Sequence, residues 1–370
     1  MRRPNPKAPP PSKHFSPEDP MNSSVTSAPW RNRVERKLTI AKAINEAIAQ
    51  EMRIDPRVFL MGEDIGAIGG IWGHTGGLLD EFGAERVRDT PISETAFIGA
   101  AVGAANLGLR PIVELMFVDF FGVCMDAIYN LAAKSSYHSN GRFKAPMVIL
   151  TAIGGGYSDS TQHSQCLYAT FAHLPGLKIV LPSNAYDAKG LLTAAMRDDN
   201  PVLFMFHKNL QGMGFLGTVK TAITDVPDDG YEVPIGVANI VRPGRDVTLV
   251  GLGATVHQAM EAAGRLSQQG VDAEVIDLRT IVPLDRNAIV RSVTKTGRML
   301  VIDDDYRNCG LAGEIIATVA ELGVPLRAPL RRLTYPDIPT PFARSMEQFA
   351  LPNADRIVDE ALNLVTGAAK

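Results

Sequence analysis

Residues 178–206 read KIVLPSNAYDAKGLLTAAMRDDNPVLFMF and contain the pattern that decides the fold. Two short apolar runs, Lys178–Leu181 and Val202–Phe206, flank Tyr186–Arg197, where apolar residues recur three or four positions apart. The spacing predicts an amphipathic helix and the flanking runs predict buried strands. A strand, a helix and a second strand predict a parallel pair, because the helix returns the chain to the edge of the sheet where it started.

The same alternation extends in both directions from this unit. Further strands are expected at Val58–Met61, Pro111–Leu115 and Met147–Ala152, and further helices at Ile40–Met52, Thr95–Leu107 and Val118–Ser136. A later series places strands at Val247–Leu252, Ala273–Leu278 and Arg298–Asp303, and helices at Ala254–Gln269, Leu311–Leu322 and Asp355–Leu364. Apolar strands that alternate with helices predict an α/β protein with two doubly wound domains, each a parallel sheet covered on both faces.

Four segments are expected along the chain. Residues 1–34 form a tail, 35–210 the first α/β domain, 211–245 a linker with some strand content, and 246–370 the second α/β domain. The tail holds eight prolines and few apolar residues, so it is expected to be disordered. A transit peptide led by Arg2 and Arg3 is the alternative, although the prolines disfavour the amphipathic helix of such peptides. Met21 is an alternative start.

The overall composition excludes several classes of protein. Hydrophobic residues make up 45% and charged residues 21%, which is typical of a globular protein. The net charge is −3 and the basic residues are scattered, which disfavours a nucleic-acid partner. Cys124, Cys166 and Cys309 are too few for a disulfide framework, and no apolar run approaches the roughly 20 residues that span a bilayer. We expect a cytoplasmic protein.

Two polar residues are candidates for chemistry because of their positions. Glu94 ends the segment DTPISE (Asp89–Glu94) and begins a helix of small residues, where a carboxylate meets the positive end of the helix dipole. A simple capping acid is the alternative. His163 lies in QHSQ (Gln162–Gln165), after a strand and three glycines, where ligands gather in open α/β sheets. A solvated surface histidine is the alternative.

These segments resemble the β subunit of the decarboxylating component of 2-oxo acid dehydrogenase complexes, a family that includes the pyruvate, branched-chain and acetoin dehydrogenases. The similar motifs follow the family's order over about residues 36–365: GED (Gly62–Asp64), DTPISE, GLRPIVELMFVDF (Gly108–Phe120), QHSQ, PGLKIVLPSNAYDAKGLL (Pro175–Leu192), DDNPV (Asp198–Val202), DVTLVGLGATV (Asp246–Val256), EVIDLRTIVPLD (Glu274–Asp285) and DIPTPFA from Asp337. DFFGVCMD (Asp119–Asp126) is most similar to the acetoin branch. The resemblance implies a pyrimidine-binding transketolase-like domain followed by a transketolase C-terminal-like domain.

Three residues take their roles from this resemblance. Glu94 matches the glutamate that hydrogen-bonds the aminopyrimidine ring of thiamine diphosphate and favours the tautomer that removes the thiazolium proton. Burial beside the cofactor would favour its protonated form. Phe120 matches an aromatic residue that packs against the pyrimidine. His163 matches a histidine on the substrate side, which would donate a proton or orient the intermediate before acyl transfer to a lipoyl group.

The resemblance also implies metal ions and partners. Some relatives hold a structural potassium ion through main-chain oxygens that match those of Met147, Ala195, Asp198 and Asn200. The Gly-Asp-Gly turn and later Asn that bind the diphosphate through Mg²⁺ in this cofactor class are missing from the sequence. The resemblance places that half of the site on an α subunit. It predicts an α₂β₂ heterotetramer, with the site at the α/β interface, that docks to a lipoyl acyltransferase core.

Two other functions of a different kind compete with this one. Gly251, Gly253 and Asp277 imitate a dinucleotide-binding fingerprint, but Val256 stands where the third glycine is required for close packing of helix on strand. A non-catalytic scaffold is the other alternative. It is disfavoured because both Glu94 and His163 are present.

A third alternative keeps the fold and the cofactor but changes the reaction. A split transketolase would need several histidines and arginines for a phosphosugar, whereas only His163 and His138 stand near the expected site. Leu150 and Ala127 also replace residues that are frequent in the family, which leaves the substrate unassigned. The sequence therefore predicts cleavage or oxidative decarboxylation of acetoin or a small 2-oxo acid, with transfer of the acyl or hydroxyalkyl group to a lipoyl arm.

Overall fold

The computed structural model describes residues 36–212 and 218–367, which belong to one compact unit. The tail at residues 1–34, with the alternative start at Met21, lies outside the described residues. Within the described part, no helix is long and apolar enough to cross a lipid bilayer.

The first sheet has seven strands in the order β12-β6-β7-β5-β4-β2-β3. Their bounds are β2 Val58–Gly62, β3 Val87–Asp89, β4 Arg110–Phe117, β5 Val148–Ile153, β6 Lys178–Val180, β7 Val202–His207 and β12 Thr280–Val282. Strands β6 and β7 are parallel and joined by helix α7 (Ala185–Arg197), as the opening stretch of sequence predicts. Every pairing in this sheet is parallel except that of β12 with β6.

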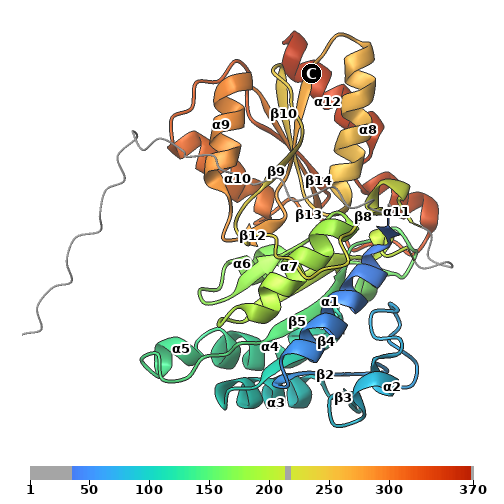
Figure 1. Ribbon diagram of the computed structural model, residues 1–370. Coiled ribbons are helices and arrows are strands. Elements are labelled where there is room, and N and C mark those ends of the chain that lie inside the picture. Colours follow the sequence, from blue (N-terminus) through green and yellow to red (C-terminus); the bar gives the residue numbers. More distant parts are fainter. Residues whose placement is uncertain (1–35, 213–217, 368–370) are drawn as a thin grey trace, which may run out of the picture. The chain divides into compact units, whose positions relative to one another are not determined.

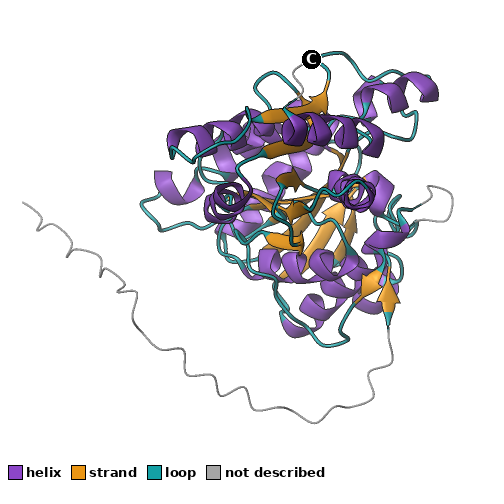
Figure 2. Ribbon diagram, turned by 90° about the horizontal axis from the view of Figure 1, so that it is seen from above, coloured by secondary structure: helices purple, strands orange, loops and turns teal. Residues whose placement is uncertain are grey.

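Helices cover both faces of this sheet. Helix α1 (Ile40–Ile54) lies beside α7 on one face, and helix α3 (Glu94–Asn106) packs on the other (Figure 1). Figure 2 shows the helices on both sides of the strands. The starts of α1 and α7 are fixed by side-chain caps, because Thr39 accepts a hydrogen bond from the Lys42 amide and Asn184 accepts one from the Asp187 amide.

The single helix expected at Val118–Ser136 is broken into several pieces. A 3₁₀ turn (Val118–Phe120) leads into α4 (Phe121–Asp126), a π-helical stretch (Ala127–Ala132) and α5 (Ser135–His138). The Thr95 hydroxyl donates a hydrogen bond of 2.5 Å to the carbonyl of Val123, and Cys124 departs from helical angles. A carbonyl that a side chain engages in this way disturbs the regular ladder, which breaks the helix beside the candidate site.

The second sheet has the order β14-β13-β10-β11-β9. Its strands are β9 Asn239–Arg242, β10 Val247–Gly251, β11 Ala273–Asp277, β13 Met299–Tyr306 and β14 Arg331–Tyr335. Helices α8 (Ala254–Gln268) and α12 (Ala354–Thr366) pack on one face, and α9 (Arg286–Thr296) and α10 (Leu311–Glu321) on the other. Strand β9 lies within residues 211–245, the expected linker, and pairs with β11. We propose that the second domain begins with this strand.

The two sheets are joined by shared packing rather than by the chain alone. One apolar cluster runs from α3 and β4 into β10, β13 and α10. Strand β12 comes from the later part of the chain but extends the first sheet. The short elements are β1 Lys37–Leu38, which pairs with β8 Thr224–Asp225, α2 Leu78–Phe82, α6 Tyr168–Ala172 and α11 Arg344–Ala350, with 3₁₀ turns at Thr161–His163, Lys208–Leu210 and Lys220–Ala222.

Candidate functional site

Glu94 is the first residue of α3, just beyond the carboxyl end of β3. Its side chain is half-buried and lies near two groups that its negative charge affects. Burial raises the pKa of Glu63, and the charge of Glu94 adds to this effect. Burial also raises the pKa of the Cys124 thiol to about 12, again with a contribution from Glu94. Glu94 therefore stands where β2, α3 and α4 meet.

A second buried acid lies behind this group. Glu114 of β4 is opposite Gly62, the last residue of β2, in the parallel pairing. Burial raises the pKa of Glu114 to about 8, with a smaller contribution from Glu63. Both carboxylate oxygens of Glu114 and one of Glu63 are buried without a hydrogen-bond partner. Buried polar atoms without partners are uncommon and often mark a site where a ligand supplies the missing contact.

The structure brings Phe120 and His163 together. The His163 ring meets Phe120 edge to face at 5.5 Å between centroids, and meets Phe117 at 4.8 Å. Phe117 ends β4, Phe120 lies in the 3₁₀ turn that follows, and His163 lies in the loop after β5. These are adjacent parallel strands, so the three rings gather at the carboxyl edge of the sheet, where ligands bind in such folds.

A carboxylate fixes the two loops that carry these rings. Asp119 accepts hydrogen bonds from the backbone amide and the side-chain amide of Gln165, at 3.3 and 2.9 Å. Burial raises the pKa of Asp119, and the bonds from Gln165 oppose that effect. Tyr306, from β13, donates to the Gln165 side-chain oxygen at 3.2 Å. The second domain therefore also holds the loop of His163.

Lys208 is a buried lysine at the candidate site, and the sequence analysis did not identify it. It follows β7 at the carboxyl edge, and only 1% of it is exposed. Its ammonium group donates to the Asp159 carboxylate at 2.7 Å and to the carbonyl of His163, and lies 5.6 Å from the centre of the Phe117 ring. A lysine next to His207, at the end of the apolar run Val202–Phe206, is the signal in the sequence that could have identified it.

Two glycines allow the His163 loop to approach β7. Gly154 has φ of +90°, and a Cβ there would lie 2.0 Å from Nε2 of His207. Gly156 has φ of +111°, and a Cβ there would lie 2.4 Å from the Asn209 side-chain amide. Both the backbone angles and the close contacts require glycine. The glycine-rich stretch thus lets the loop of His163 pack closely against the end of β7.

The four carbonyls expected to hold potassium lie elsewhere. Met147 precedes β5, Ala195 lies near the end of α7, and Asp198 and Asn200 lie in the turn before β7. They are therefore at the amino edge of the parallel sheet, opposite the edge that carries His163. The Met147 carbonyl accepts from the Val202 amide at 2.9 Å and that of Ala195 accepts from the Asp198 amide at 3.3 Å.

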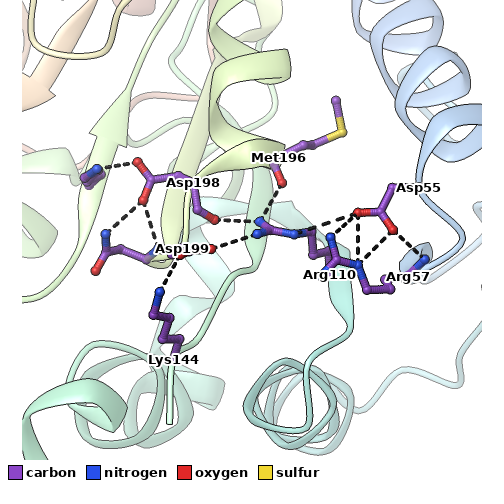
Figure 3. Close-up of polar contacts among 9 residues, drawn as sticks. Asp55, Arg57, Arg110, Lys144, Met196, Asp198 and Asp199 are labelled. Carbon is purple, nitrogen blue, oxygen red and sulfur yellow. Dashed lines mark hydrogen bonds and ion pairs between the residues drawn. The ribbon is translucent and has the colours of Figure 1, made fainter. Parts of the chain in front are cut away.

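A guanidinium group occupies part of this region. Arg110 donates to the carbonyls of Met196 and Asp198, at 3.1 and 2.9 Å, and to the Asp199 carboxylate at 2.7 Å (Figure 3). A carbonyl oxygen can accept twice, so a cation and Arg110 could share the Asp198 oxygen. Across residues 36–212 and 218–367, no group of three or more His, Cys, Asp or Glu side chains is arranged to hold a metal ion.

A cavity of about 550 Å³ lies away from these residues. It is bounded by α6, β12 and the start of α10, and His173, Arg286, Cys309 and Glu314 supply its polar lining. None of the seven residues predicted from the sequence to form a site lines this cavity. The candidate site is instead an open group of side chains at the carboxyl edge of the first sheet.

Comparisons with known proteins define the class. Residues 36–213 match the transketolase pyrimidine-binding domain and residues 236–357 match the transketolase C-terminal domain. A split-gene transketolase, described as an inactive β₄ tetramer, has a similar fold, with a TM-score of 0.70, 20% identity, and coverage of 89% of this chain and 98% of that one. The class is therefore that of the transketolase-like proteins, which are thiamine-diphosphate-dependent.

Closer relatives narrow the class to one family. The β subunit of acetoin:2,6-dichlorophenolindophenol oxidoreductase from Cupriavidus necator is 45% identical, over 90% of this chain and 98% of the relative. The 2-oxoisovalerate dehydrogenase β subunit of Bacillus subtilis is 44% identical, over 85% and 94%. The pyruvate dehydrogenase E1 β subunit of Rhizobium meliloti is 44% identical, over 87% and 68%. The chain belongs to the family of β subunits of acetoin and 2-oxo acid dehydrogenases, as the sequence motifs predict.

Proposed function

We propose that this chain supplies the pyrimidine half of the active site of a thiamine-diphosphate-dependent dehydrogenase that acts on acetoin or a small 2-oxo acid. The acyl unit would pass to the lipoyl group of an acyltransferase core. The observation that carries the proposal is that Glu94, Phe120 and His163 follow β3, β4 and β5 at the same carboxyl edge of the first sheet, where Phe120 and His163 are in contact. The acids Glu63 and Glu114 behind them have buried oxygens without partners, which suits a ligand that offers hydrogen-bond donors.

Each residue would act on a different part of the bound molecules. When bound, thiamine diphosphate supplies a carbanion for attack on the substrate carbonyl and then accepts electrons from the carbon–carbon bond that breaks. Glu94 would hold the aminopyrimidine ring by a hydrogen bond, and Phe120 would pack on its face. His163 lies against Phe120 and would donate a proton, or orient the acyl group for transfer to the lipoyl sulfur.

The surface beside Glu94 supports an α partner. Large apolar side chains are exposed on and around α3, α4 and α5: Ile92 83%, Leu107 84%, Val123 61%, Met125 41%, Leu131 46% and Tyr137 89%. Gathered apolar exposure of this kind is typical of a subunit interface. We propose an α₂β₂ assembly in which the α subunit covers this surface and binds the diphosphate through Mg²⁺.

We also propose a potassium ion at the carbonyls of Met147, Ala195, Asp198 and Asn200. The support is that all four residues lie at the amino edge of the sheet, and that a carbonyl oxygen which accepts one hydrogen bond retains a second lone pair. The guanidinium group of Arg110 donates to the same Asp198 carbonyl oxygen. Its positive charge would repel a nearby cation, so we expect potassium to bind weakly. A melting temperature that is equal in potassium and choline chloride would argue against this site.

The complex is proposed to work in the cytoplasm. Cys124, Cys166 and Cys309 are free thiols, which suits a reducing compartment. Fractionation of cells with an antibody against the chain tests this, and recovery from an oxidising compartment would contradict it.

Calorimetry tests the proposed half-site. Thiamine diphosphate and Mg²⁺ are titrated into the chain alone and into the chain co-expressed with its α partner. We expect tight binding only in the complex. Turnover is then measured with acetoin, pyruvate and branched-chain 2-oxo acids and an artificial electron acceptor. Tight binding by the chain alone would refute the divided site, and turnover of ketose phosphates alone would favour a split transketolase.

A further inference from the structure

The loop that carries His163 has a backbone conformation that needs support from outside. Between β5 and His163, four residues have positive φ: Gly154 at 90°, Gly156 at 111°, Ser158 at 62° and Ser160 at 70°. Serine rarely adopts this left-handed region, because its Cβ crowds the backbone there. Such a conformation persists only where surrounding contacts impose it.

Glu347 supplies the strongest of these contacts. It lies in α11, about 190 residues further along the chain, and none of its surface is exposed. One carboxylate oxygen accepts from the Gly156 amide at 2.7 Å, and the other accepts from the Ser158 amide at 2.9 Å. A buried carboxylate that accepts two backbone hydrogen bonds fixes both position and orientation, because charge-assisted bonds are short and strong.

Other contacts fix the remainder of the loop. Lys208 holds the Asp159 carboxylate and the carbonyl of His163 from the side of β7. Thr161 donates to the Thr340 carbonyl at 3.0 Å, in the segment just before α11. The loop is therefore held on one side by the first domain and on the other by the C-terminal segment that carries Glu347.

Helix α11 has little other structural role. Only Glu347 and Ala350 are buried among its seven residues, while Met346 and Phe349 are 59% and 84% exposed. Loss of the Glu347 carboxylate should therefore loosen the loop without disturbing the apolar core. A variant that loosens the loop and leaves the core intact would therefore distinguish a positioning role of Glu347 from a general contribution to folding.

We propose that Glu347 is a positioning residue that holds the His163 loop in its working conformation through the Gly156 and Ser158 amides. The expected effect of Glu347 on turnover rests on the proposed function. The expected effect of Glu347 on the loop conformation does not depend on that function. Glu347 does not touch the reacting atoms; it acts through the place of the His163 ring against Phe117 and Phe120.

The first test measures the loop directly and needs no activity. Glu347→Gln replaces one acceptor oxygen with an amide group that cannot accept. Hydrogen exchange of residues 154–165 should become at least about tenfold faster in the variant, while α1 and α7 stay protected. The matched control is Glu321→Gln, since Glu321 is exposed at the end of α10. Unchanged exchange in this loop would overturn the proposal.

The second test uses turnover of the complex with its α partner. We expect Glu347→Gln to lower kcat about tenfold, with KM and cofactor affinity changed less than about twofold. In a His163→Ala background the same substitution should have no further effect, because both changes act on one element. Independent, multiplicative losses would contradict the proposal. A wild-type complex without any turnover would count against the proposed function, and the exchange result would still decide the role of Glu347.

A second variant covers the case in which Glu347→Gln fails to fold. Gly155→Ala places a Cβ 3.1 Å from the Glu347 carboxylate, which must shift by a few tenths of an ångström and so lengthen its bonds to the loop amides. We expect a smaller loss of kcat than in Glu347→Gln, together with faster exchange in the loop. A Gly155→Ala protein with normal turnover and normal exchange would also overturn the proposal.

Discussion

Glu114→Gln should make the protein less sensitive to rising pH. Glu114 is fully buried in β4, neither of its carboxylate oxygens has a partner, and burial raises its pKa from an ordinary 4.5 to about 8. An acid whose pKa is raised by folding destabilises the native state wherever the unfolded state binds fewer protons than the native state does. The cost is therefore nearly absent below pH 4.5, grows between pH 4.5 and pH 8, and levels off above pH 8.

The size of the effect follows from that range of pKa. Each pKa unit corresponds to about 1.36 kcal/mol, so ionisation costs the wild type on the order of 4 kcal/mol by pH 8 and under about 1 kcal/mol at pH 5. Glutamine has the same shape and no charge. Relative to the wild type, the variant should gain roughly 3–4 kcal/mol between pH 5 and pH 8. For a chain of this size that corresponds to a rise of roughly 5 °C in relative melting temperature.

Unfolding of both proteins by urea is measured at pH 5, 6.5 and 8, and melting temperatures are recorded in parallel. Glu261→Gln is the matched control, because that carboxylate is 66% exposed on α8. Its stability relative to the wild type should not vary with pH. A difference between Glu114→Gln and the wild type that stays constant from pH 5 to pH 8 would refute the reasoning, since it would mean that Glu114 ionises normally.

Three further predictions concern the site itself. Glu94→Gln should lower turnover by at least about a hundredfold while the α/β complex still elutes intact on size exclusion, and near-normal turnover would remove Glu94 from the mechanism. Gly154→Ala should destabilise the chain by roughly 1–3 kcal/mol in urea unfolding, because the new Cβ would lie 2.0 Å from the His207 ring, and an unchanged midpoint would show that the loop can move aside. Phe120→Ala should weaken cofactor binding up to about tenfold, as measured by calorimetry, because the edge-to-face contact with His163 and the packing surface of the ring are lost. Equal affinity in the variant and the wild type would mean that the pyrimidine does not pack on Phe120.

The strands and helices that form by local pattern were predictable. The run Val202–Phe206 became β7 with one more residue, and Ile40–Met52 became α1 with two more. Fully apolar runs must lie inside a sheet, and a period of three to four residues has few other outcomes than a helix. In contrast, α9 reads RNAIVRSVTKT and buries the polar Ser292 and Thr296 beside Ile289 and Val293, and β14 reads RRLTY, with two charged residues at its start. The structure of these two elements depends on packing against neighbouring elements that the local sequence does not identify.

The candidate site also contains some residues that could be predicted from the sequence and others that could not. Phe120 and His163 each follow a predicted strand, so their place at one edge of the sheet follows from the order of the strands. Glu94 follows β3 (Val87–Asp89), a strand that the sequence analysis did not predict. The roles given to them remain predictions that the experiments above test. Lys208 shares that edge and had a weak signal in the sequence. Glu347 had none, because its contact with the loop depends on how α11 returns to the first domain.

The sequence by itself determined the class of fold, the family and the edge of the sheet that carries the candidate residues. It could do so because apolar period, turn residues and family motifs are local properties of the chain. Tertiary structure alone decided the break in the helix after Val118, the addition of β12 to the first sheet, and the hold of Glu347 on the His163 loop. Each of these depends on a hydrogen bond or a strand pairing between segments far apart in the chain, whose partners are selected by packing and not by local pattern.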